Sequence, residues 1–196
     1  MRTNTRLGAA ILGLAAGVST WHLSLPEAEA TPVQVRPEVR VYGAAAEQVD
    51  LSRWAVRRFE AAGLEAPAVE IHFHGDADGC GGHLGYAKSG RVDVCTTLVN
   101  AMTRRNLLHE MGHIWLDQNV TESTRARFLQ LQGLVSWNSG SVPWRDRGYE
   151  QGAEIIAWAL GERILTPSIP DVAPERLEAA FELLTGSAMP AAGAPD

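Results

Sequence analysis

The sequence predicts an α+β fold, with a small N-terminal mixed sheet and one helix followed by a mostly helical C-terminal half. Short runs that alternate apolar and polar residues, typical of strands, occur at 39–42, 69–74 and 91–97. From residue 100 onward the apolar residues recur at helical spacing instead. The chain of 196 residues is 45% hydrophobic and 20% charged, which is ordinary for a globular domain and excludes wholesale disorder.

The individual elements follow from their start and stop signals. A helix over 51–62 is predicted because Asp50 is a good N-cap, the apolar residues share one face, and Gly63 follows. The segment 75–90 is rich in glycine and polar residues and is predicted to be a loop. Further helices are expected at about 101–118, 122–134, 149–163 and 174–185.

Residues 1–30 have the layout of a secretory signal peptide. Arg2 and Arg6 precede the uncharged run 7–18, and Ala28-Glu29-Ala30 supplies small residues before a cleavage site after Ala30. The apolar run is too short to span a bilayer, which needs about 20 residues. We therefore expect a secreted bacterial protein whose mature form does not span a membrane. It would comprise a single domain, 31–187, and a flexible tail, 188–196.

Charge and cysteine content narrow the class of protein further. The net charge of −6 argues against a nucleic-acid partner, which would normally bind a basic face. Cys80 and Cys95 are the only cysteines, and an oxidising compartment favours a disulfide between them.

The segment His109-Glu110-Met111-Gly112-His113 is an H-E-x-x-H motif inside a predicted helix. Residues four apart lie on the same face of a helix, so the two imidazoles can converge on one Zn²⁺ ion. Glu110 is rotated away from that line and can accept a proton from a water that the metal activates. The alternative is a helix with two structural histidines.

The predicted helix over 149–163 carries two carboxylates, Glu150 and Glu154, four residues apart. One of them can supply a third metal ligand while the other orients an imidazole. The alternative is a solvated acidic face. Arg145 and Arg147 just before it could bind a peptide carboxylate, although most arginines are simply surface residues.

HEMGH followed by a helix with Glu150 and Glu154 resembles the zincin metallopeptidases, specifically the gluzincin branch. The resemblance implies a zincin-like fold, one catalytic zinc, His109, His113 and Glu150 as metal ligands, Glu110 as general base, and Glu154 beside a ligand. Glu154 stays open as the third ligand, because thirty-six residues separate His113 from Glu150. Asp117, four residues after His113, continues the line of the two histidines and could also be a ligand or orient a histidine. The third histidine of the metzincin pattern is absent, which excludes that branch.

A second polar cluster lies upstream of the motif. It comprises His72, His74, Asp76, Asp78, Cys80 and His83, and could hold a metal or form a polar loop beside the cleft. The sequence as a whole favours a secreted zinc-dependent peptidase acting on a peptide or protein substrate. The alternative is a secreted metal-binding or interaction protein on the same scaffold, without turnover.

Overall fold

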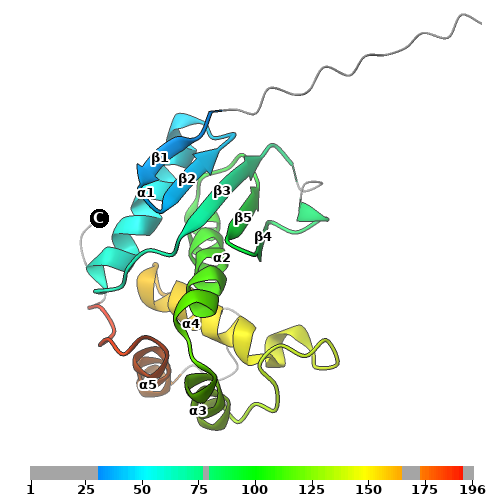
Figure 1. Ribbon diagram of the computed structural model, residues 1–196, viewed down its shortest axis with the longest axis vertical. Coiled ribbons are helices and arrows are strands. Elements are labelled where there is room, and N and C mark those ends of the chain that lie inside the picture. The colour runs from blue at the N-terminus through cyan, green and yellow to red at the C-terminus, as the bar shows by residue number, and fades with distance from the viewer. Residues whose placement is uncertain (1–30, 77–79, 165–172, 192–196) are drawn as a thin grey trace, which may run out of the picture.

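The computed structural model describes residues 31–76, 80–164 and 173–191. Its five strands are β1 (Val33–Arg36), β2 (Val39–Tyr42), β3 (Val69–His74), β4 (Gly85–Lys88) and β5 (Arg91–Cys95). Its helices are α1 (Ala46–Ala61), α2 (Ala101–Asn119), α3 (Glu122–Gln132), the 3-10 turn η2 (Trp144–Asp146), α4 (Gly148–Leu160) and α5 (Pro174–Thr185). The predicted α+β layout is confirmed, with the mixed sheet at one end and α3 and α5 at the other (Figure 1).

The strands form one mixed sheet in the order β1-β2-β3-β5-β4. The three central strands β2, β3 and β5 run parallel, and β1 and β4 are antiparallel edge strands. In β3 the residues Val69, Ile71 and Phe73 are buried, while the alternate residues are only partly buried. This alternation is what a sheet with one face against the core requires.

Helices α2 and α4 cross at small residues. A Cβ atom added to Gly112 of α2 would lie only 3.3 Å from the Cα atom of Ala153 in α4. A Cβ atom on Gly152 would likewise lie 3.0 Å from a methyl group of Leu116. The missing side chains let the two helices approach closely, which brings the polar residues of α4 against those of α2.

Two predictions for the N-terminal half were wrong. The segment 75–90 is not all loop, because β4 pairs with β5 along its whole length. Helix α1 begins at Ala46, so Asp50 lies inside it and forms an ion pair with Arg53 instead of capping it. The helix start is held by the side chain of Gln48, whose Oε1 accepts a hydrogen bond from the backbone N–H of Ala45 at 2.7 Å.

The short strand β1 was not predicted at all, and the remaining predicted elements lie within about three residues of their expected ends. In the described ranges no helix is long and apolar enough to cross a membrane. The predicted signal peptide and its cleavage site lie outside the described residues, as do positions 192–196 of the predicted tail.

Candidate metal centre

The H-E-x-x-H segment lies in the middle of α2, where helical geometry aligns its two histidines. The helix is capped by Asn100, whose side chain accepts a hydrogen bond from the N–H of Thr103 at 3.0 Å. His109 and His113 are one turn apart and only 5% and 6% exposed. Their Nε2 atoms are 3.1 Å apart and their rings are nearly perpendicular, at 86°. The two imidazoles therefore converge on one point.

The third member of the group is Glu150 from the first turn of α4. Its Oε2 lies 3.1 Å from Nε2 of His113 and 3.6 Å from Nε2 of His109. Atoms that bind one tetrahedral zinc at about 2.0–2.1 Å are about 3.3 Å from each other. The Oε2 atom is buried and makes no hydrogen bond to any described residue. The three atoms thus have the spacing and the free lone pairs that one metal ion needs.

The protonation states suit a metal ligand set. Burial lowers the pKa of His109 to about 4, so its imidazole is neutral. For Glu150, burial raises the pKa, but the adjacent imidazoles of His109 and His113 outweigh it and lower the pKa to about 2. Neutral imidazoles and an ionised carboxylate are the forms that bind divalent metals.

Glu154 lies beside the group and contacts the far side of His109. Its Oε2 is 3.0 Å from Nδ1 of His109, and its Oε1 contacts the guanidinium of Arg105. A proton held on Nδ1 by this carboxylate directs the lone pair of Nε2 toward Glu150 and His113. Glu154 therefore orients an imidazole, and Glu150 supplies the oxygen that faces both histidines.

Asp117, the other candidate ligand, is engaged elsewhere. Its carboxylate accepts a hydrogen bond from the Tyr149 hydroxyl at 2.9 Å. The ring of Tyr149 packs on that of His113, with 4.2 Å between ring centres. Asp117 and Tyr149 thus support His113 from the side away from His109. This contact of Tyr149 could not be predicted from the sequence, because it joins two helices that are far apart along the chain.

Glu110 lies next to the group and is 7% exposed. Burial raises its pKa to about 7, so its carboxyl exchanges a proton near neutral pH. A Cβ atom added to Gly85 of β4 would lie 3.0 Å from Cγ and 3.1 Å from Oε1 of Glu110. The absence of a side chain at this position of the edge strand therefore leaves room for the carboxyl group.

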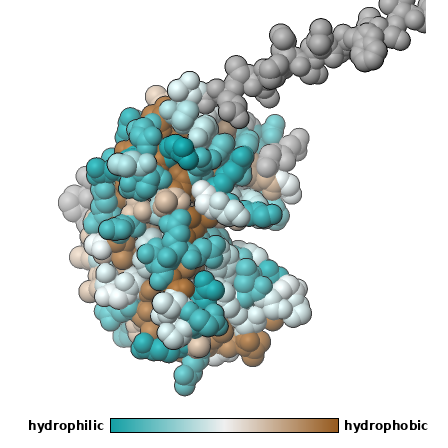
Figure 2. All heavy atoms as spheres, viewed as in Figure 1, coloured by the Kyte–Doolittle hydropathy of each residue, from teal (hydrophilic) through white to brown (hydrophobic). Residues whose placement is uncertain are grey.

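The three metal-facing residues, together with Glu110, Glu154 and Tyr149, line one cleft of about 930 Å³. One wall is residues 83–87, at and before β4, and the opposite wall is formed by η2 and the start of α4, with α2 as the floor. The notch between the β4 side and the lower helices is visible in Figure 2. Four exposed large apolar residues line it: Leu84, Tyr86, Met102 and Trp144.

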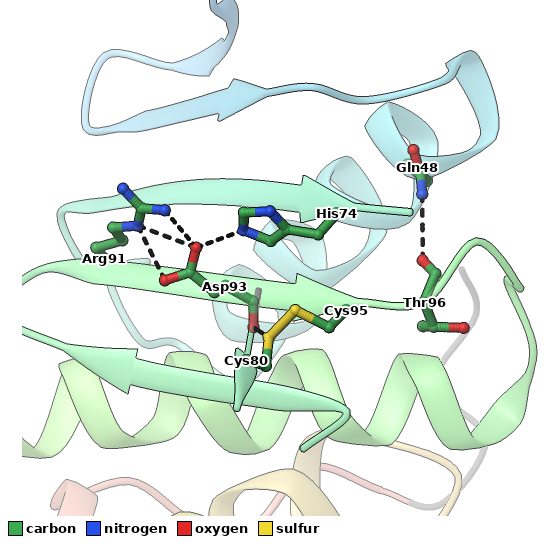
Figure 3. The surroundings of a disulfide bond; sticks show 7 residues. All are labelled: Gln48, His74, Cys80, Arg91, Asp93, Cys95 and Thr96. Atoms are coloured by element: carbon green, nitrogen blue, oxygen red, sulfur yellow. Dashed lines mark hydrogen bonds and ion pairs between the residues drawn. A yellow bond between two sulfur atoms is a disulfide. The ribbon is translucent and has the colours of Figure 1, made fainter. Parts of the chain in front are cut away.

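The second polar cluster of the sequence does not form one site among the described residues, and Figure 3 shows the part around His74 and the disulfide. Nε2 of His74 lies 2.6 Å from Oδ1 of Asp93, which also pairs with Arg91. Cys80 forms the expected disulfide with Cys95, and His83 instead lines the cleft. Asp78 lies outside the described residues. Among the described residues, only His109, His113 and Glu150 form a group that could hold a metal ion.

Comparison with known proteins gives no relative: no family model, no curated protein and no solved structure matches the chain. The interpretation of the site therefore depends on its own geometry.

Proposed function

We propose that this protein is a secreted zinc-dependent peptidase of the gluzincin type. The observation that carries the proposal is the position of Glu110, which faces the cleft beside the group formed by His109, His113 and Glu150. A protein that only stores or senses a metal has no need for a buried carboxyl group that lines the cleft beside the metal-facing residues. The disulfide is compatible with an oxidising, extracellular location.

Hydrolysis forms a bond between a water oxygen and the carbonyl carbon of the substrate and breaks the C–N bond. The bound zinc ion would supply Lewis acidity, lowering the pKa of water from 15.7 to about 7. Glu110 would accept the proton that the attacking water loses and deliver it to the departing amine nitrogen. His109, His113 and Glu150 would hold the ion, and Glu154 would keep His109 in the required tautomer.

The cleft supports a peptide as the substrate class. It is open to solvent, runs between an edge strand and the start of α4, and has exposed apolar side chains along its walls. Buried sites for small ligands enclose most of their ligand, whereas an open groove of this kind accommodates an extended chain.

The decisive experiment compares the wild type with Glu110→Gln after loading with zinc. Both proteins should bind one zinc ion per chain, while only the wild type should cleave a mixed-sequence peptide library. Glu122→Gln is the matched control, since its side chain is 91% exposed on α3 and it should cleave like the wild type. A wild type that binds zinc but cleaves nothing in the library would contradict the proposal and favour a metal-binding protein without turnover.

A further inference from the structure

The cleft is lined by two arginines, Arg105 and Arg147, which have different partners. Arg147 is the residue immediately before α4, and its side chain lines the cleft together with Tyr149 and Glu150. Its Nε donates a hydrogen bond to the backbone oxygen of Val142 at 3.0 Å, which fixes the plane of the guanidinium. The residue is partly buried. Within the described chain no carboxylate lies at ion-pair distance from it.

Two acidic residues of the cleft, Glu150 and Glu154, are committed to other partners. Glu150 faces the two imidazoles, and Glu154 contacts Arg105 and His109. The hydrogen bond to Val142 satisfies one N–H group of the partly buried Arg147 guanidinium. Its remaining N–H groups are available to an anion that enters the cleft.

We propose that Arg147 binds a carboxylate of the peptide substrate and thereby positions the scissile bond over the metal centre. This inference rests on the proposed peptidase function. With Nε occupied by Val142, the two terminal nitrogens remain to form parallel hydrogen bonds with both oxygens of one carboxylate. The carboxylate is either the free C-terminus, which makes the enzyme a carboxypeptidase, or an Asp or Glu side chain of the substrate.

The test compares kcat/KM between pairs of peptides that differ only in one carboxylate. One pair has the same sequence with a free or an amidated C-terminus, and a second pair differs by Glu or Gln at one position near the cleaved bond. For one pair, the wild type should show about 10- to 100-fold higher kcat/KM on the member with the carboxylate, as expected for a charged hydrogen-bonded pair. The pair that shows the preference identifies the source of the carboxylate.

In Arg147→Ala that preference should disappear, while zinc content changes little. Arg147→Lys keeps the positive charge but lacks the planar guanidinium, so it should retain part of the preference. This variant tests the proposal if the alanine variant folds poorly. Arg145→Ala is the matched control, because Arg145 is exposed and does not line the cleft.

Two results would overturn the inference while leaving the peptidase intact. One is a wild type that cleaves both members of each pair equally well, and the other is an Arg147→Ala variant that keeps the wild-type preference. A wild type that cleaves no peptide at all would instead reject the peptidase function, and this inference with it.

Discussion

Glu154→Gln should weaken zinc binding about 10- to 100-fold without abolishing it, the range seen when the outer carboxylate of a metal-binding histidine is replaced. Glu154 is 1% exposed, and its Oε2 lies 3.0 Å from Nδ1 of His109. Glutamine preserves the shape of the side chain but removes the charge that holds the imidazole in one tautomer. The expected loss in binding free energy is about 1.4–2.7 kcal/mol.

Glu154→Ala should have an additional effect on folding. The side chain of Arg105 is only 14% exposed and would lose the carboxylate that it contacts. Removing one partner of a buried ion pair costs about 3–5 kcal/mol of unfolding free energy. The control is Glu162→Gln, because Glu162 pairs with Arg104 at 3.0 Å on the surface, with both side chains more than 40% exposed. That exposed pair should contribute less than about 1 kcal/mol.

Zinc affinity is measured by competition with a chromophoric chelator, and stability by urea unfolding of the metal-free proteins. Glu150→Gln provides the reference for losing a direct ligand. If Glu154→Gln binds zinc as tightly as the wild type, the carboxylate does not orient His109. If it loses zinc as completely as Glu150→Gln, then Glu154 is itself a ligand. Either result refutes the assignment made here.

Three further predictions concern the disulfide, the edge strand and pH. Replacing Cys80 and Cys95 by alanine opens a loop with a sequence separation of 15; this should cost about 3 kcal/mol and lower Tm by about 6–12 °C, as calorimetry would show. Gly85→Ala places a methyl group against the amide nitrogen of Asn106 and 3.0 Å from Cγ of Glu110, so peptide cleavage should fall about 10- to 100-fold at unchanged zinc content. Burial lowers the pKa of His109 to about 4 and raises that of Glu110 to about 7. As pH falls the first shift reduces stability and the second increases it, so metal-free Glu110→Gln should lose about 3 kcal/mol in urea unfolding between pH 6.5 and pH 4, while the wild type should lose much less.

The parts of the site that follow from local geometry could be predicted from the sequence. The convergence of His109 and His113 depends only on the spacing of residues in one helix. The choice between Glu150 and Glu154 could not be made, because both lie on the same face of α4. Which of them reaches the histidines depends on the position along α2 at which α4 crosses it, and this position is set by tertiary packing.

The edge strand was missed for a related reason. The residues Gly85–Lys88 contain no β-branched side chain and follow a glycine-rich segment, so their local preference is for a loop. They form a strand because β5 offers a free edge for antiparallel pairing. One wall of the cleft is therefore built by a long-range contact that no local pattern in the sequence reports.

The precision of the metal centre depends on residues that never touch a ligand. Gly112 lies between the two histidines, and Ala153 lies one turn after Glu150; these two residues meet where α2 and α4 cross. A larger side chain at either position would separate the helices, because packed cores do not absorb even a methylene group without shifting. The oxygen of Glu150 would then move away from Nε2 of His113, now 3.1 Å distant. The short side chains at the crossing are therefore as necessary to the geometry of the site as the three residues that could hold the metal.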